Sequence, residues 1–358
     1  MTITNTRRAL MFGAAAMALA GPAGAEITVS RRFRAGRPVV LNGPEQVERL
    51  SSVLQGDVRA ARSTATLVHI PIFRVEIAKQ VRKNARTRGI GGASQTSTFV
   101  LENVDDAAVQ AMTQGLYEQF VAGLRAQGYR VASIEETRAD VNLGRFFNDR
   151  PSPLNGNVAD GQSTFYVPQG MSVNPVTGDT RVPQGLGTFG VVGEMSNTAM
   201  SLVRAAMAGS IVLMPRFAVG FVDVEASSDR FLGDLGNSAS VSGRGAMRLL
   251  PEATRVEIFA PTTPGQFRQD WVALTSPLLL SGVDVGPLHD ATTDAQRRDA
   301  LAGQAIAVLG ALAGLGGGGT SQYNTNAMTA GPRLAETLMP YLEAVQGQFL
   351  LAVRPTGT

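Results

Sequence analysis

The first clear pattern of apolar and polar positions along the chain, at residues 67–77, predicts β-structure. Residues 67–77 are apolar and β-branched and end in alternation, which is typical of a strand, and Pro71 suits an edge or first position. Residues 79–92 follow as a basic stretch that ends in glycines, and we interpret them as a connection.

The clearest unit comes next along the chain. Residues 96–102 predict a strand, and apolar side chains then recur at spacings of three and four over residues 109–124, which predicts a helix. Asn103 or Asp105 can cap this helix. Residues 129–134 predict another strand, so we expect a β-α-β unit with parallel neighbouring strands and a right-handed crossover.

The stretch over residues 142–193 differs from its surroundings, because Gly, Pro and Asn abound in it. A structureless connection of this length is uncommon inside a compact domain. It is either a functional surface insertion or a linker between two lobes, and we favour the insertion.

The second half of the chain predicts both helical and antiparallel structure. We expect a helix over residues 195–208, a long strand over residues 211–225, and a hairpin that pairs residues 239–250 with residues 254–260.

The last part of the chain predicts a second helix-then-strand unit. A helix over residues 293–315 gives way to a glycine-rich breaker, and residues 332–345 then predict a helix and residues 348–353 a strand.

These elements predict an α/β (α+β) fold class, with a mixed sheet that combines a β-α-β unit with an antiparallel portion and has helices packed on it. We divide the chain into a signal peptide (1–25), a basic N-terminal arm (26–62) and an α/β domain (63–358) with the insertion at about 142–193.

The signal peptide is expected from three features of residues 1–25. Arg7 and Arg8 are its only charges, residues 9–20 are uncharged, and small residues at 23–25 suit cleavage. We therefore expect a periplasmic or secreted protein. The paired arginines resemble the twin-arginine export signal, so the twin-arginine route and the general secretory route both remain open.

Composition excludes several kinds of chemistry. The 358 residues are 44% hydrophobic and 17% charged, as in a globular protein, and include 40 Gly and 18 Pro. There is no cysteine. Disulfides, thiolate catalysis and cysteine-based metal sites are therefore excluded.

Charge is distributed unevenly along the chain. Residues 26–88 hold thirteen Arg and Lys against five Asp and Glu, so this part is where an anionic partner would bind. For the charge of this region as a whole, we favour the simpler interpretation of a solvated face with flexible ends.

A basic run inside that part is the candidate binding patch. Its members are Lys79, Arg82, Lys83, Arg86 and Arg88. Clustered cations attract phosphate or lipid head groups and acidic protein surfaces. Aromatic residues that could stack bases are not interleaved, so we expect an envelope protein or an anionic lipid surface as partner and no nucleic acid. A homo-oligomer is a further expectation left open.

Catalytic candidates are few. Asp223 and Glu225 lie two residues apart on a predicted strand, so they share a face, and two carboxylates can do acid and base work. An ordinary polar strand end is the alternative. Only His69 and His289 could supply imidazole ligands, and we interpret His69 as a hydrogen-bonded residue of the sheet.

No cofactor or metal is expected. Residues 185–190 match the glycine pattern of dinucleotide-binding loops, but a polar stretch with a proline precedes them where a buried strand is required. Leu301 to Gly319 is uncharged and carries glycines at four-residue spacing, which suits close helix packing, a glycine hinge or contact with a membrane.

Two helix-to-strand passages carry a family resemblance. Residues 124–131, Leu-Arg-Ala-Gln-Gly-Tyr-Arg-Val, and residues 202–212 resemble the curli-secretion lipoprotein family and the N-terminal domain of the Tol-system β-propeller protein. The resemblance covers residues 65–260 and implies an α/β envelope protein. The lipoprotein cysteine is absent, so no functional residue and no pore formation is carried over.

We therefore expect a non-catalytic periplasmic or envelope-associated protein that binds another envelope component through its basic region and the 142–193 insertion. Two alternatives remain. One is a secreted hydrolase acting on an envelope substrate with Asp223 and Glu225, and the other is a peripheral membrane or secretion-pore component.

Overall fold

The structure is a computed structural model of the chain. It describes residues 37–46, 54–57, 64–87, 93–148, 150–158, 160–174, 188–231, 236–251, 253–263, 265–301 and 321–353. The expected signal peptide lies outside the described residues.

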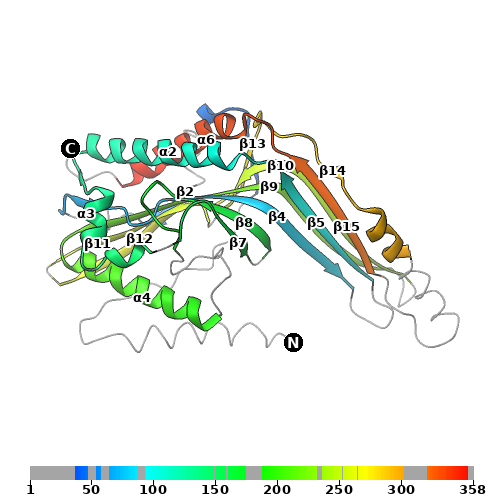
Figure 1. Cartoon of the computed structure of the whole chain (residues 1–358), viewed down its shortest axis with the longest axis horizontal. Coiled ribbons are helices and arrows are strands. Elements are labelled where there is room, and N and C mark those ends of the chain that lie inside the picture. The colour runs from blue at the N-terminus through cyan, green and yellow to red at the C-terminus, as the bar shows by residue number, and fades with distance from the viewer. Residues whose placement is uncertain are drawn as a thin grey trace.

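The described residues form one mixed sheet with helices packed on it, which confirms the α/β (α+β) fold class (Figure 1). Its fifteen strands are β1 (Val39–Leu41), β2 (Leu54–Asp57), β3 (Leu67–His69), β4 (Arg74–Arg86), β5 (Ser94–Glu102), β6 (Arg130–Val131), β7 (Leu154–Val158), β8 (Gly161–Tyr166), β9 (Ile211–Phe231), β10 (Gly236–Leu249), β11 (Arg255–Pro261), β12 (Phe267–Leu274), β13 (Leu278–Leu280), β14 (His289–Asp290) and β15 (Ser321–Thr329).

Helices cover both faces of the inner part of the sheet. They are α2 (Asp106–Ala126), α3 (Ile134–Ala139), the 3-10 turn η3 (Gly144–Phe146), α4 (Thr188–Met207) and α6 (Leu334–Ala352), and residues 294–301 form a further helical segment. In the described part of the chain, none of them combines the length and the apolar character needed to cross a membrane.

The core between the sheet and the helices is aromatic. Helices α2 and α6 lie together over one face, and α4 lies on the opposite side (Figure 1). Phe73 from the sheet contacts Phe120 of α2, and Phe217 of β9 contacts Phe349 of α6, with ring centroids 6.0 and 5.8 Å apart. All four rings are fully buried, so this cluster holds the two helices on the sheet.

Strand β9 is a central strand of the sheet and pairs with four others. Along one edge it pairs first with β11, through Val212 to Arg216, and then with β10, from Val219 onward. Along the other edge it pairs with β3 and then with β4, in parallel, as far as Val219. Beyond Val219, β9 and β4 separate.

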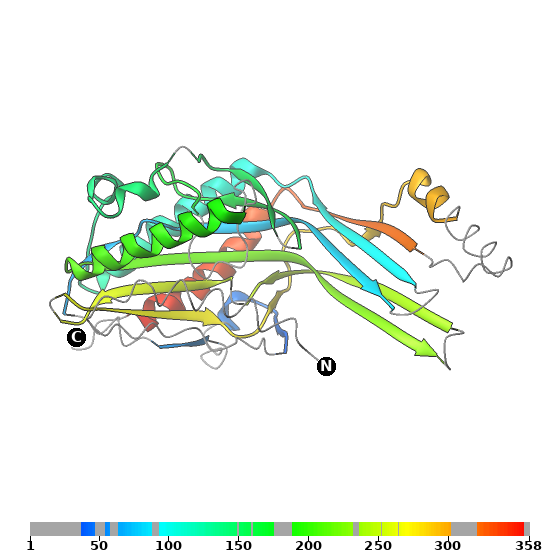
Figure 2. The same cartoon turned by 90° about the horizontal axis from the view of Figure 1, so that it is seen from below.

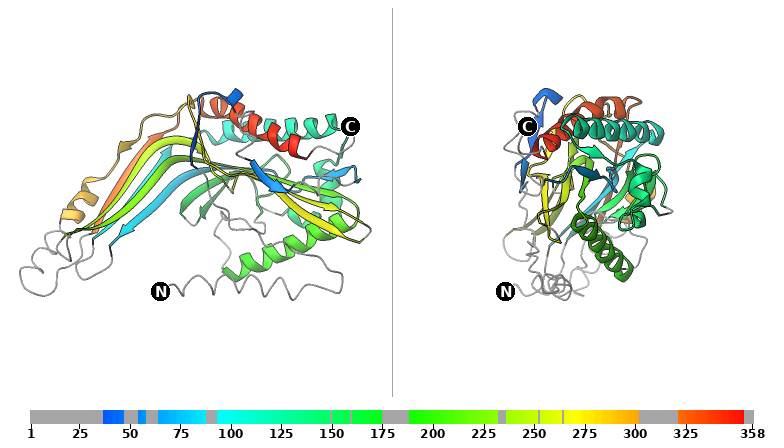
Figure 3. Two further views of the ribbon diagram at one scale, coloured as in Figure 1. Left: turned by 180° about the vertical axis from the view of Figure 1, so that it is seen from behind. Right: turned by 90° about the vertical axis from the view of Figure 1, so that its left-hand side faces the viewer.

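The outer halves of β4, β5, β9, β10 and β15 project beyond the helices, and we call this part the β-extension (Figures 1 and 2). Its strands run side by side away from the body in the view from behind as well (Figure 3). β5 pairs with β4 and, in parallel, with β15. The molecule is therefore elongated, with a helix-covered body and an extension of strands beside whose outer part lies the helical segment at residues 294–301 (Figure 1).

The structure agrees closely with three of the predicted elements. α2 begins after Asp105, whose carboxylate accepts hydrogen bonds from the amides of Ala107 and Ala108. Gly128 follows it with φ of 90°, the left-handed conformation that glycine adopts most readily. Strand β9 and helix α4 also lie where the pattern places them.

Residues 79–86 correct one prediction, because they continue strand β4 and are not a connection. The charged residues of this segment are typical of a connection, but here they belong to the part of the strand that is exposed to solvent. Residues 348–353 correct another, because most of them extend α6. Phe349 lies four residues after Val345, so the apolar run that resembled a strand is the buried side of a helix.

The predicted hairpin over residues 239–260 is also wrong. β10 and β11 do not pair with each other; both pair with β9, which is 21 residues long and offers one edge to each in turn.

The expected β-α-β pairing is wrong as well, since β6 pairs with β3 and not with β5. Helix α2 has 21 residues and spans about 30 Å at about 1.5 Å per residue, so it carries the chain to the far end of the sheet.

The glycine-rich stretch over residues 142–193 holds more regular structure than its composition predicts. Residues 154–166 form the hairpin of β7 and β8, and β8 joins the main sheet against β4. Phe165 and Tyr166 are fully buried, so the hairpin is part of the core.

Candidate functional site

Strand β4 carries the predicted basic patch from the body into the β-extension. Its first residues, from Arg74 to Ala78, are buried among neighbouring strands, whereas Arg82, Lys83 and Arg86 are exposed. The change follows the end of the pairing with β9 at Ile77 and of that with β8 at Val81, beyond which β5 is the one described strand that still pairs with β4.

The exposed cations of β4 are not held in ion pairs by the described residues. Arg82, Lys83 and Arg86 form no ion pair with a carboxylate of the described chain. The neighbouring strand β5 is uncharged from Ser94 to Leu101, so it supplies none either. Side chains alternate along a strand, so Arg82 and Arg86 project from one face and Lys83 from the other. The outer part of β4 thus carries three exposed cations distributed over both of its faces, and we call residues 82–86 the basic edge.

Lys79 and Arg88 do not join the basic edge. Lys79 Nζ donates to Asp106 Oδ1 at 3.0 Å, and Tyr166 Oη donates to the same oxygen at 2.6 Å. Burial works to raise the pKa of Asp106, but the hydrogen bonds from Tyr166 and Lys79 outweigh it and hold that pKa below its usual value. Lys79 therefore stabilises the start of α2. Arg88 lies outside the described residues.

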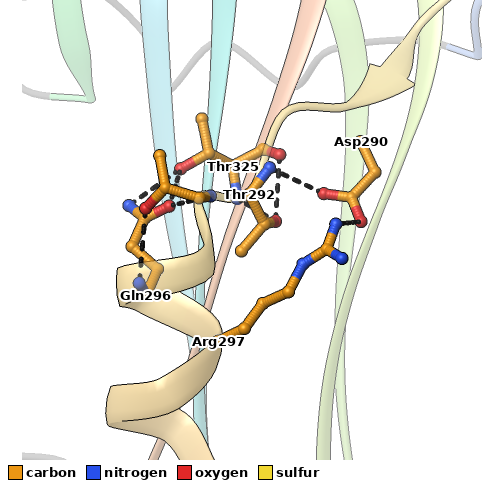
Figure 4. A network of polar contacts seen from close by, with 6 residues as sticks. Asp290, Thr292, Gln296, Arg297 and Thr325 are labelled. Atoms are coloured by element: carbon orange, nitrogen blue, oxygen red, sulfur yellow. Dashed lines mark hydrogen bonds and ion pairs between the residues drawn. The ribbon is translucent and has the colours of Figure 1, made fainter.

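A second basic element nearby is neutralised. Arg297 Nη2 lies 3.2 Å from Asp290 Oδ2, and Thr292 donates its amide to the other oxygen of that carboxylate (Figure 4). Gln296 and Thr292 in turn hydrogen-bond to Thr325 of β15. This network fixes the segment after β14 on the β-extension and pairs the charge of Arg297.

The backbone edge of β4 is open along the same residues. β8 pairs with β4 only as far as Val81, and the last contact is the Arg82 amide donating to the carbonyl of Asp160 at 2.7 Å. No strand of the described chain lies beyond it on this side. The basic edge thus combines three exposed cations with an unpaired strand edge, and it adjoins the β7–β8 hairpin.

The candidate carboxylates lie on β9 in the β-extension. Asp223 forms an ion pair with Arg248 of β10, and Glu225 is exposed two residues further along. The guanidinium compensates the Asp223 carboxylate. The residue directly opposite Asp223 on β10 is a second arginine, Arg244, so cations and not a further carboxylate flank this pair.

A buried ionic row was missed by the sequence analysis. Arg74, Arg216 and Arg255 stand in register on β4, β9 and β11, and Arg74 and Arg216 are 2–3% exposed. Arg216 lies 2.5 Å from Glu257, which also pairs with Arg255. A charge at every second position of an apolar strand, as in Arg255-Val-Glu257, is the signal that could have indicated this row.

The buried row is a structural feature and supplies no exposed reactive group. Like charges in register repel one another, and buried ions are tolerated where they are paired. Glu257 compensates two of the guanidiniums, and Arg74 also lies over the ring of Phe165 at 5.2 Å.

The histidines are apart from each other. His69 is buried at the end of β3, with Nδ1 3.1 Å from Thr137 Oγ1, which confirms it as a hydrogen-bonded sheet residue. His289 is exposed on β14. Within the described ranges, no three His, Asp or Glu side chains gather in a way that could hold a metal ion.

Two other candidates fall on residues that the structure does not describe. Of the glycine pattern at 185–190, only residues from 188 onward are described, as the start of α4, and of the 301–319 segment only Leu301 is described.

No family model, no curated protein and no solved structure matches this chain. The resemblance to envelope α/β proteins therefore remains an expectation from the sequence.

Proposed function

We propose that this chain is a non-catalytic binding protein of the cell envelope and that it contacts another envelope component through the basic edge. The observation that carries the proposal is the surplus of charge on β4. Arg82, Lys83 and Arg86 are exposed on a strand that projects from the body, and no carboxylate of the described chain compensates them.

The expected second contact region adjoins the first. The β7–β8 hairpin comes from the 142–193 stretch, and β8 pairs directly with β4. A partner that binds the basic edge would therefore reach this hairpin as well. This supports a single binding surface built from both regions that the sequence nominated.

The surroundings of Asp223 and Glu225 favour a binding role over hydrolysis. Asp223 is ion-paired with Arg248, and Glu225 is exposed, so the two carboxylates do not face each other across an enclosed site.

The test is capture of partners from gently solubilised envelopes by the tagged full chain. The variant carries Arg82→Gln, Lys83→Gln and Arg86→Gln. A matched control removes three exposed cations elsewhere, through Arg125→Gln, Arg204→Gln and Arg298→Gln. We expect a component that the wild type and the control retain and the variant loses. Identical capture by all three proteins, or no specific capture, would contradict the proposal.

A further inference from the structure

The backbone of β4 directs two unpaired peptide groups outward along the basic edge. The Arg82 amide points toward β8, because it donates to the carbonyl of Asp160. In a strand, every second residue turns both backbone groups to the same edge. Asn84 and Arg86 therefore present their N–H and C=O groups on this edge, where no described strand pairs with them.

The opposite edge of β4 is fully used and does not depend on these groups. Lys83 and Ala85 are in register with Ser97 and Gln95 of β5. The Thr87 amide then donates to the carbonyl of Ala93 at 2.9 Å and closes the ladder. An added strand would consequently leave the β4–β5 pairing intact.

The length of the open edge sets the size of what can bind. Residues 82–86 extend about 15 Å at about 3.3 Å per residue, enough for a segment of about five residues. Such a strand would lie in line with β8 and continue its place beside β4.

The side chains along the edge determine what the added strand should contain. Arg82, Asn84 and Arg86 alternate with Lys83, so the cations lie on both faces of the strand. Side chains directly opposite one another on paired strands interact, and opposite charges there are favourable. A strand with an acidic residue at alternate positions would place its carboxylates opposite Arg82 and Arg86.

We propose that the basic edge binds an extended acidic segment of a partner protein, which adds to the sheet as a strand beside β4. This rests on the proposed function and specifies the kind of partner and its mode of binding. Backbone hydrogen bonds from Asn84 and Arg86 would hold the segment, and the cations would select for acidic sequences.

The probe is a labelled peptide of about nine residues with alternating Glu and Thr, titrated into the full chain and followed by fluorescence anisotropy. Its control is the same peptide with an N-methyl group on every backbone amide, which removes the hydrogen-bond donors on both edges and keeps the charge. We expect the methylated peptide to bind at least about tenfold more weakly, since several backbone hydrogen bonds are lost.

The protein-side variant is Asn84→Pro, compared with Asn84→Ala. Proline removes the outward N–H and is tolerated on an open strand edge, whereas alanine removes only the side chain. We expect Asn84→Pro to weaken binding by about tenfold and Asn84→Ala by less than about twofold. Hydrogen exchange provides an independent measurement: peptide binding should slow the amides of Asn84 and Arg86 and leave those of Lys83 and Ala85 unchanged.

Other outcomes would overturn the strand-addition proposal. Equal binding of both peptides would do so even if Asn84→Pro failed to fold. Self-association that Asn84→Pro abolishes, without peptide binding, would assign the edge to a second copy, and binding only to anionic vesicles would assign it to lipid. If the three Gln substitutions on β4 still abolished envelope capture, the proposed function would stand while this mode of binding failed.

Discussion

The side-chain amide of Gln95 on β5 bonds to both backbone groups of Val241 on β10. Gln95 Oε1 accepts from the Val241 amide at 3.2 Å, and Gln95 Nε2 donates to the Val241 carbonyl at 3.4 Å. Both residues are less than a tenth exposed. The side chain thus takes the place of a neighbouring strand and fastens the β9–β10 ribbon to the β5 sheet inside the β-extension.

Replacing Gln95 by Leu should destabilise the protein by about 1–3 kcal/mol, because the Val241 N–H and C=O would be left buried without partners. The free energy of unfolding in urea measures this. Gln322→Leu is the matched control, since Gln322 stands in register with Gln95 on β15 but is exposed. Equal losses in both variants would show that the Gln95–Val241 contact contributes nothing specific.

Two glycine substitutions should have opposite signs. A Cβ added to Gly243 would lie 2.1 Å from the ring of Phe99, so Gly243→Ala should cost about 1–3 kcal/mol through overpacking. A Cβ on Gly347 of α6 meets nothing within 4 Å, so Gly347→Ala should stabilise by about 0.5–1 kcal/mol. Thermal unfolding of both variants tests the pair. A stabilising Gly243→Ala would mean that the layers of the β-extension are not in close contact.

The buried ionic row predicts a large effect at Glu257. Glu257→Gln should destabilise by about 3–5 kcal/mol, since Arg216 would remain buried without this carboxylate. Chemical denaturation measures the loss. Glu336→Gln breaks the exposed pair with Arg333 and should leave the denaturation midpoint nearly unchanged. Similar midpoints for the two variants would argue against burial of the row.

The sequence predicts local structure well where several local signals agree. The helix after Asp105 has a cap, apolar spacing and a terminal glycine that agree, and the structure follows them. Residues 348–353 gave a false strand because a short apolar run fits either a strand or the buried side of a helix. Only the contact between α6 and the sheet decides between them.

Pairing between distant segments could not be predicted, because it depends on strand length and order. β9 can pair with both β11 and β10 along one edge because it continues past Val219. The alternation of residues 211–225 does not show which strands will pair with it. The same holds for the candidate site. Arg82, Lys83 and Arg86 were nominated from their charge, but Lys79 was separated from them by Asp106, which is close only in the folded chain.

The protonation of His69 should make stability depend on pH. Thr137 Oγ1 donates to the carbonyl of Ser133 at 2.8 Å, so His69 Nδ1 donates to Thr137 Oγ1, and burial disfavours the positive charge that a second ring proton would add. Burial lowers the pKa of His69 below its ordinary value of 6.5, although the carboxylates of Asp140 and Glu136 oppose this. The contribution of His69 is therefore complete above pH 6.5 and is lost as the pH falls through the lowered pKa.

We expect the urea midpoint of the wild type to decrease between about pH 7.5 and about pH 5.5. The decrease should be smaller in His69→Gln, because a glutamine side chain at this buried position does not titrate. His289→Gln is the control, because His289 is exposed on β14 and its replacement should leave the slope of the wild type unchanged. If His69→Gln retained the full slope, the pH dependence would have to arise from carboxylates. Asp106 would not account for such a slope, because, against the effect of burial, hydrogen bonds from Tyr166 and Lys79 lower its pKa from 3.8; its contribution is complete above pH 3.8, and Asp106→Asn should leave the slope between about pH 7.5 and about pH 5.5 unchanged.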